Sequence, residues 1–172
     1  MPSRLSRILL WLLVIDLGMA LGAGLFESRI VVPDWIVSVD SGVAFNADAA
    51  RHDDTGRRFW VAVTTVPLTL LTLANLLVAW RATGRTRKWW LGAALIALAE
   101  RIFTFSYFIP TMVRLMEAPA PQELGSEMAR WAQLDYLRHA VVLAALLAAL
   151  GAFSLVYEQR GSLSSQASAG SR

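Results

Sequence analysis

Four long apolar stretches constrain the fold of this chain more than any other feature of its sequence. They cover residues 8–26, 59–80, 89–110 and 135–157. Each is about 20 residues long, enough for one helix to cross a hydrocarbon core of ~30 Å at ~1.5 Å per residue. With 56% hydrophobic and 17% charged residues, the chain is too apolar for an ordinary soluble domain. The sequence predicts one all-α domain, residues 1–158, forming an integral membrane four-helix bundle.

The first apolar stretch has an alternative interpretation as a cleavable signal peptide. It begins after basic residues and contains small residues around Ala20 and Gly22. However, Asp16 interrupts its apolar centre, and the apolar run continues to Phe26. These two features favour a membrane span.

The distribution of charge predicts how the bundle is oriented. The N-terminus, the link 81–88 and the C-terminal tail hold eight Lys and Arg residues and one acid, Glu158. The two opposite loops, 27–58 and 111–130, hold six basic and nine acidic residues. By the positive-inside rule, both termini are therefore expected in the cytoplasm (N-in/C-in) and the loop 27–58 outside.

Two further expectations concern the tail and the source of the protein. Residues 159–172 are polar and serine-rich, which predicts a disordered cytoplasmic tail. All but one of the basic residues are arginine, the exception being Lys88. That bias is typical of GC-rich bacterial genomes, so we expect the bacterial plasma (inner) membrane.

Several kinds of partner and cofactor are not expected. The chain has no cysteine, which excludes disulfides, thiolate metal sites and iron–sulfur clusters. Only His139 lies in a predicted span, so a haem held by two transmembrane histidines is not available, and His52 beside Asp53 and Asp54 is a weak metal motif. No nucleotide-binding motif occurs, and the basic residues flank apolar runs instead of forming a patch for nucleic acid. We therefore predict neither a metal nor a cofactor.

Polar residues follow one face of the third helix. At about 100° per residue, the residues of this face are Glu100, Thr104, Tyr107, Thr111 and Arg114. An ionised side chain facing lipid costs several kcal/mol, so this face is expected to contact protein or enclosed water.

The first and last helices carry matching polar faces. Asp16 and Glu27 share a face of the first helix, and counting residues from the outer ends places Asp16 level with Arg101, so we expect these two to pair. Trp131, Asp135 and Arg138 share one face of the last helix. A second cluster is expected nearer the outer surface, from Glu27, Arg114, Asp135, Arg138 and His139. The whole set is approximately neutral, as a buried network requires. The bundle is thus predicted to have a polar interior toward its outer side.

Two interpretations of this interior stay open. The charge pairs either fix the register of a small bundle, or they line an outward-opening pocket where an acid or histidine moves protons and arginine holds an anionic oxygen. A further hypothesis, proton-coupled transport, needs an alternating path, and four helices are few for such a path unless the protein oligomerises.

Four segments together resemble one known family. They are Glu27 preceding Val31-Val-Pro33, Gly56-Arg-Arg-Phe-Trp60, Phe108-Ile-Pro-Thr-Met-Val-Arg-Leu115 and Trp131-Ala-Gln-Leu-Asp-Tyr-Leu-Arg138. In order and spacing they resemble the anthrone-oxygenase-like family of small four-helix membrane proteins, most of unknown function. The resemblance implies oxidation of anthrones to anthraquinones by molecular oxygen without an evident cofactor. The chain departs from the family pattern at Met112 and Asp135, where asparagine is common.

These observations lead to one enzymatic hypothesis and one alternative. In the first, the protein is a cofactor-free, anthrone-type monooxygenase, with Asp135 and His139 as proton acceptors and with Arg138 and Arg101 stabilising the oxyanion. The predicted pocket residues are Glu27, Glu100, Thr104, Tyr107, Thr111, Arg114, Trp131 and Asp16. The expected partners are membrane lipid and a lipophilic small molecule. The sequence does not decide between a monomer and a homo-oligomer. In the alternative, the protein is a non-catalytic accessory or interaction protein whose buried charges fix helix packing.

Overall fold

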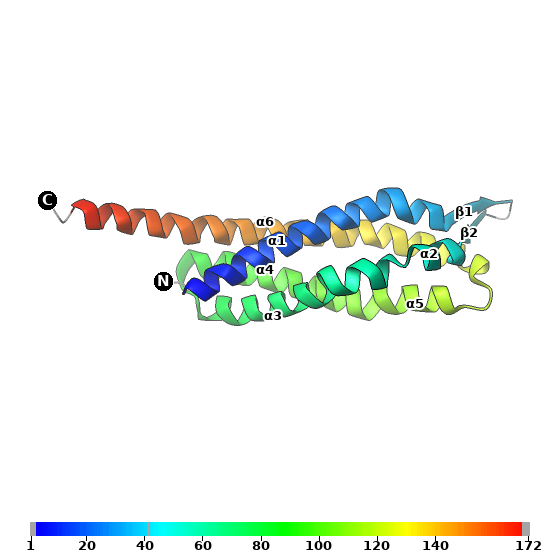
Figure 1. Ribbon diagram of the computed structural model, residues 1–172, viewed down its shortest axis with the longest axis horizontal. Helices are drawn as coiled ribbons and strands as arrows, with labels where there is room; N and C mark the ends of the chain where they lie inside the picture. The colour runs from blue at the N-terminus through cyan, green and yellow to red at the C-terminus, as the bar shows by residue number, and fades with distance from the viewer. Residues whose placement is uncertain (1–2, 41, 170–172) are drawn as a thin grey trace.

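The computed structural model describes residues 3–40 and 42–169, which form an elongated set of four long helical rods lying side by side (Figure 1). In this part of the chain, four helices are long and apolar enough to cross a membrane: Arg4–Trp35, Gly56–Arg81, Gly84–Glu117 and Gly125–Glu158. Each contains one of the four predicted spans and extends beyond it. The protein is therefore a helical integral membrane protein.

The first rod is longer than its apolar stretch. α1 (Arg4–Phe26) begins at Ser3, whose side chain accepts a hydrogen bond from the Ser6 amide at 3.1 Å. The helix does not end at Phe26, where the sequence predicted the outer loop to begin. It continues through a π turn, η1 (Glu27–Val31), and a 3-10 turn, η2 (Val32–Trp35).

The rest of the predicted outer loop is also structured. β1 (Ile36–Val39) and β2 (Gly42–Phe45) form an antiparallel hairpin with Ile36 opposite Phe45. A short helix, α2 (Ala47–Asp53), follows. We call this end of the bundle the hairpin end (Figure 1). It is ordered because the loop supplies its own apolar side chains: Trp35 and Phe45 are buried, and the Trp35 Nε1–H donates to Asp53 Oδ2 at 2.8 Å.

The second and third rods run between the hairpin end and the link 81–88. The second consists of a π segment, η3 (Gly56–Thr65), and α3 (Val66–Arg81). The third consists of α4 (Gly84–Phe103), a π turn η4 (Thr104–Phe108) and α5 (Ile109–Glu117). Both rods therefore change from π to α geometry near the hairpin end.

The fourth rod follows a 3-10 turn, η5 (Pro121–Leu124), and is the single helix α6 (Gly125–Ala169). Its backbone is helical through residues 159–169, where composition predicted disorder. Extending an existing helix costs much less than starting one, and no proline interrupts this part of the chain. The last three residues of the predicted tail, 170–172, lie outside the described residues.

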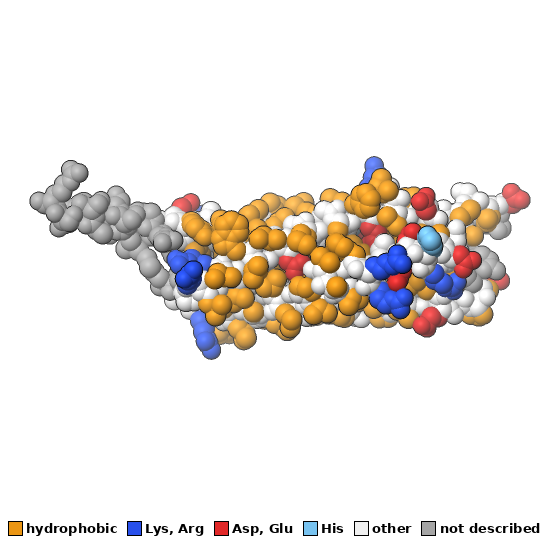
Figure 2. All heavy atoms as spheres, in the orientation of Figure 1, with side chains coloured by type: hydrophobic (Ala, Val, Ile, Leu, Met, Phe, Trp, Pro, Cys, Tyr) orange, Lys and Arg blue, Asp and Glu red, His pale blue; other side chains and the backbone are white. Residues whose placement is uncertain are grey.

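Two apolar clusters fill the bundle. The larger one joins α1, α3, α4 and α6 through leucine and alanine side chains, including Leu13, Leu68 and Ala97, and small residues allow such helices to approach closely. The second lies at the hairpin end and includes Trp35 and Trp131. Figure 2 shows hydrophobic side chains along the middle of the outer surface and charged ones gathered toward the ends. That pattern fits helices surrounded by lipid.

Candidate functional site

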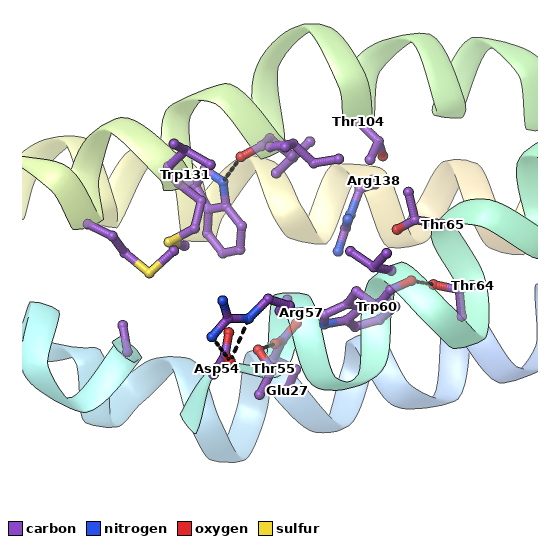
Figure 3. Close-up of a pocket in the computed structure, with 18 of the residues that line it drawn as sticks. Glu27, Asp54, Thr55, Arg57, Trp60, Thr64, Thr65, Thr104, Trp131 and Arg138 are labelled. Carbon is purple, nitrogen blue, oxygen red and sulfur yellow. Dashed lines mark hydrogen bonds and ion pairs between the residues drawn. The ribbon is translucent and has the colours of Figure 1, made fainter. Parts of the chain in front are cut away.

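A pocket of about 440 Å³ lies among the helical rods near the hairpin end (Figure 3). All three π segments contribute to its wall: Glu27 comes from η1, Trp60 from η3, and Thr104 and Phe108 from η4. α6 closes another side with Arg138. π turns inside α-helices often mark functional sites, because the wider turn moves side chains away from their α-helical positions.

Prolines account for the position of these π segments. Pro33, Pro67 and Pro110 each stand two residues after the end of η1, η3 and η4, respectively. A proline has no N–H for the carbonyl four residues earlier, and its ring clashes with that carbonyl. In all three cases that carbonyl belongs to the π segment. The local sequence therefore widens three helices at the same end of the bundle and leaves space between them.

The pocket wall is mostly apolar with a few charged groups. Its apolar side chains include three tryptophans and two methionines: Trp35, Trp60, Trp131, Met112 and Met116. Its charged side chains are Glu27, Asp54, Arg57, Arg101 and Arg138. An apolar cavity with few convergent polar groups and a volume of roughly 300–1,000 Å³ is the usual form of a small-molecule site.

Arg138 is held at the pocket wall by contacts on three sides. Its guanidinium carbon lies 4.8 Å from the centre of the Phe108 ring and 5.6 Å from that of Trp60. Its Nη2 lies 2.7 Å from Asp135 Oδ1. Cation–π contact on two sides and an ion pair on a third fix the orientation of the guanidinium. Because the group carries five N–H donors, it can also bind an oxygen atom in the pocket.

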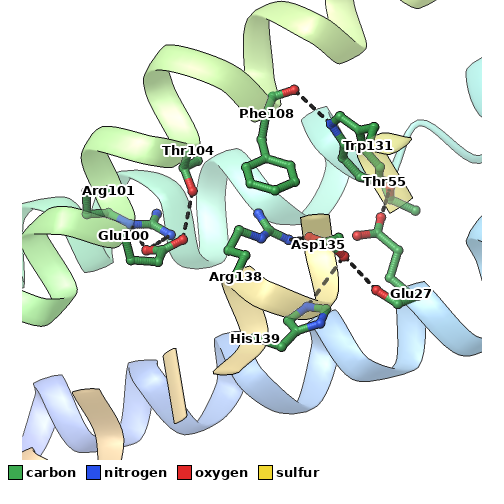
Figure 4. A network of polar contacts seen from close by, with 11 residues as sticks. Glu27, Thr55, Glu100, Arg101, Thr104, Phe108, Trp131, Asp135, Arg138 and His139 are labelled. Atoms are coloured by element: carbon green, nitrogen blue, oxygen red, sulfur yellow. Dashed lines mark hydrogen bonds and ion pairs between the residues drawn. The ribbon is translucent and has the colours of Figure 1, made fainter. Parts of the chain in front are cut away.

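Asp135 and His139 stand behind Arg138 and are not among the lining residues (Figure 4). Asp135 is fully buried, accepts a hydrogen bond from the Ser28 hydroxyl at 2.6 Å, and has its Oδ2 3.5 Å from His139 Nε2. Both residues belong to α6 and are one helical turn apart. The structure therefore brings the predicted acids and bases of α6 together, but it places them away from the space a ligand would occupy.

Glu27 is the buried carboxylate on the pocket wall. It accepts a hydrogen bond from the Thr55 hydroxyl and lies within electrostatic range of both Arg138 and Asp135 (Figure 4). Its place in η1, at the point where α1 widens, turns it toward the pocket. A buried carboxylate and a partly buried guanidinium thus share one cavity.

Arg101 pairs with its sequence neighbour Glu100 and not with Asp16. Glu100 Oε2 accepts from Arg101 Nε at 2.6 Å, and Glu100 Oε1 accepts from the Thr104 hydroxyl at 2.7 Å. Among the described residues, neither carboxylate oxygen of Asp16 has a hydrogen-bond partner, although Asp16 lies within electrostatic range of Arg101. The predicted direct pair was wrong because counting residues gives depth along a helix but not the direction of a side chain around it.

The predicted pocket residues divide into two groups. Glu27, Thr104 and Trp131 line the pocket, together with the predicted oxyanion-binding residues Arg101 and Arg138. The others lie elsewhere: Tyr107 stacks on Phe103, Arg114 pairs with Glu127, and Asp16, Glu100 and Thr111 are buried outside the lining.

Part of the pocket wall was not predicted from the sequence. Asp54, Thr55 and Arg57 belong to the predicted outer loop and Trp60 to the second predicted span, yet all four line the pocket. Pro67, which follows Trp60 by about two helical turns, was the available signal that this helix widens.

No candidate metal site occurs in the described part of the chain: no three His, Asp or Glu side chains come together in a way that could hold an ion. Comparisons with family models, with curated proteins and with solved structures found no match for the chain. The site is therefore interpreted from its own geometry.

Proposed function

We propose that the protein is a membrane enzyme that oxidises a lipophilic phenolic compound, of the anthrone type, with molecular oxygen and without a bound cofactor. The observation that carries this proposal is the shared cavity of Glu27 and Arg138 between aromatic walls. An acid–base group and a fixed cation are the two elements that such a reaction requires of a protein.

The shape and lining of the pocket support an aromatic ligand. Its volume is in the range of small-molecule sites, and the rings of Trp60, Phe108 and Trp131 surround it. Phe108 and Trp131 already pack edge to face, with centroids 5.4 Å apart. A flat polycyclic ligand can extend the same packing, since aromatic rings favour offset and edge-to-face contacts.

The chemistry assigns a different role to each charged residue. Glu27 removes the hydroxyl proton of the anthrol, the phenolic tautomer of the anthrone, and Arg138 stabilises the oxygen anion that forms. The electron-rich anion reduces O2 and binds it at the ring carbon opposite this oxygen. Counted from the anthrone, that carbon loses its two hydrogens and gains one oxygen atom, and the second oxygen atom leaves with both hydrogens as water.

This assignment moves the proton acceptor from α6 to η1. Asp135 and His139 become positioning residues for Arg138, because they lie behind it. Ser28 holds Asp135 from the opposite helix, so Arg138 is fixed from two elements. Preorganisation of this kind is what makes a cation effective toward a developing oxyanion.

The proposed orientation puts both termini and the link 81–88 in the cytoplasm of a bacterium and the hairpin end outside the inner membrane. The basic residues of the link and termini support this arrangement. The pocket, which lies near the hairpin end, then opens toward the outer leaflet.

A non-catalytic accessory protein is the alternative, and one observation favours it. The buried ion pairs Glu100–Arg101 and Asp135–Arg138 are each formed within a single helix and compensate their own charge. Such pairs can serve folding alone.

Oxygen consumption with dihydroxyanthrone separates the two proposals. In detergent, the wild type is expected to consume one O2 for each anthraquinone formed, faster than the uncatalysed reaction. Glu27→Gln should lower kcat by about 10²-fold or more, the usual contribution of a general base. Arg138→Lys keeps the positive charge beside Asp135 but loses the planar set of N–H donors of the guanidinium. It should lower kcat by about 10²–10³-fold.

Arg114→Gln is the matched control, since Arg114 pairs with Glu127 outside the pocket. It should keep wild-type turnover. A wild-type rate no higher than the background, or a fully active and folded Glu27→Gln variant, would contradict the enzymatic proposal. The accessory role predicts the first of these results.

A further inference from the structure

We infer that the pocket fills sideways from the lipid bilayer, through a mouth between η3 and α5, so that its ligand is a membrane-dissolved phenol. The nature of the ligand rests on the proposed function. The route rests on the geometry of the mouth alone.

Three aliphatic side chains form the mouth. Val61 of η3 and Ile109 and Val113 of α5 line the pocket, yet 48%, 39% and 43% of their surfaces are exposed. Pocket-lining side chains that are also exposed mark the place where a cavity meets the outer surface. At the mouth these side chains are apolar, whereas the other exposed edge of the lining, nearer the hairpin end, carries Arg57, whose side chain is 86% exposed.

The depth of the mouth places it beside lipid. Val61 follows Arg57 by four residues, about one helical turn, and Ile109 precedes Arg114 by five. Both segments belong to helices apolar enough to cross a membrane. The mouth therefore lies just inside the charged end of the bundle, at the boundary between lipid headgroups and acyl chains.

The side of the pocket that faces the hairpin end is covered. Trp35 and Ala50 line the pocket there and are buried. Arg51 of α2 donates a hydrogen bond to the Met116 carbonyl of α5, which ties the cover to the third rod. At the rim, Arg57 and Asp54 form an ion pair at 3.0 Å. Entry from water would have to displace these groups, whereas entry at the mouth displaces only lipid chains.

This route also sets the orientation of the ligand. Glu27 and Arg138 come from η1 and α6, and Figure 3 places both within the bundle. A phenol entering from lipid would reach them with its oxygen atom foremost and leave its apolar rings toward the mouth. Amphipathic aromatic compounds concentrate at the depth where the mouth lies.

The first test concerns the contact of the mouth with lipid. Because the sequence contains no cysteine, a single introduced cysteine can be labelled at one chosen position. Val61→Cys is labelled with bimane in detergent and reconstituted into phosphatidylcholine nanodiscs. Lipid carrying a nitroxide near the headgroup should quench the label strongly, and aqueous iodide should not. Asp48→Cys is the control, because that side chain is 96% exposed on α2, and it should show the reverse.

The second test concerns entry of the ligand into the pocket, which is measured by binding and does not require turnover. Dihydroxyanthraquinone added to nanodiscs should quench the tryptophans of the pocket. A bimane adduct on Val61→Cys or Val113→Cys should slow this quenching several-fold. The same adduct on Ile102→Cys, which is 60% exposed but not in the pocket, should leave it unchanged.

Each outcome decides a different point. Quenching of the Val61 label by iodide and not by lipid would overturn the lateral mouth. So would normal loading in the adducts at Val61 and Val113. If lipid quenches the label but the anthraquinone does not bind, the lateral mouth is supported. The phenolic ligand and the proposed function are then contradicted.

Discussion

Gly24 of α1 lies directly against His139 of α6. A Cβ atom on Gly24 would come within 2.2 Å of His139 Nε2 and 2.8 Å of its Cδ2, closer than side chains approach one another. The imidazole is buried between the two helices and is held beside Asp135. The absence of a side chain at this position of α1 therefore leaves the space that His139 occupies behind Arg138.

Gly24→Ala should displace His139 and destabilise the bundle by about 1–3 kcal/mol, the usual cost of overpacking. Gly22→Ala is the matched control on the same helix, since nothing lies within 4 Å of its added Cβ. Thermal unfolding in detergent should show a lower Tm for the first variant and no loss for the second. Equal Tm values for the two variants would contradict the contact between α1 and His139.

Pro110→Ala should reduce ligand affinity while the protein stays folded. The new N–H can bond the carbonyl of residue 106, which favours a regular α-helix in place of η4. Thr104 and Phe108 would then turn away from their places in the pocket wall. Tryptophan quenching by dihydroxyanthraquinone measures the affinity.

Pro119→Ala, in the bend after α5, is the control and should bind the anthraquinone with wild-type affinity. An unchanged affinity for Pro110→Ala would show that this proline does not shape the pocket.

Asn75→Leu should destabilise the half of the bundle that lies away from the pocket. The Asn75 amide donates to the Leu9 carbonyl of α1 at 3.0 Å and accepts from Trp90 Nε1–H of α4 at 2.9 Å, so it joins three helices. We expect a loss of about 1–2 kcal/mol, the upper range for hydrogen bonds between membrane helices.

Chemical unfolding in detergent measures this loss, with Thr69→Val as the control. The Thr69 hydroxyl bonds the Thr65 carbonyl of its own helix segment at 2.6 Å, and its removal should change stability little. A larger loss from the threonine variant than from Asn75→Leu would reverse this ranking.

Gly125→Ala should loosen the hairpin from the start of α6. A Cβ at this position would lie 1.9 Å from the Val43 carbonyl oxygen, so the backbones must separate. Faster amide hydrogen exchange in β1 and β2 is the expected result. Gly92→Ala, with open space around its Cβ, should leave exchange unchanged. Protection of the hairpin equal to the wild type in Gly125→Ala would mean that the two backbones are not in contact.

The sequence predicted the helical spans well, because long apolar runs have few other solutions. It also placed Trp131 and Arg138 on one face of α6, and both line the pocket. That helix is α-helical over the whole interval, so 100° per residue holds. For these two residues, the face predicted from a regular helix was correct.

The polar face of the third rod was harder to predict because η4 interrupts it. Glu100 and Thr104 are joined by a hydrogen bond, whereas Tyr107 and Arg114 lie outside the pocket. A π turn holds more residues than an α turn, so every side chain beyond it is rotated from its expected direction. A stripe drawn with α geometry therefore breaks at the π segment.

The hairpin was missed for a different reason. Its strands are only four residues long, and the predicted loop was judged by its many acids and glycines. The β-branched residues on either side of Asp40 and Gly42 were the feature of the sequence that could have indicated a hairpin. The residues against which the hairpin packs, such as Met128 in α6, are distant in sequence, so this packing could not be predicted.

The most direct measurement of the central claim is a structure of the protein in nanodiscs with dihydroxyanthraquinone. We predict a flat density in the pocket lined by Trp60, Phe108 and Trp131, with one oxygen atom within hydrogen-bond distance of the Arg138 guanidinium and the opposite edge toward Val61 and Val113. Density bound elsewhere on the bundle, with the pocket closed by a direct Glu27–Arg138 ion pair, would contradict it.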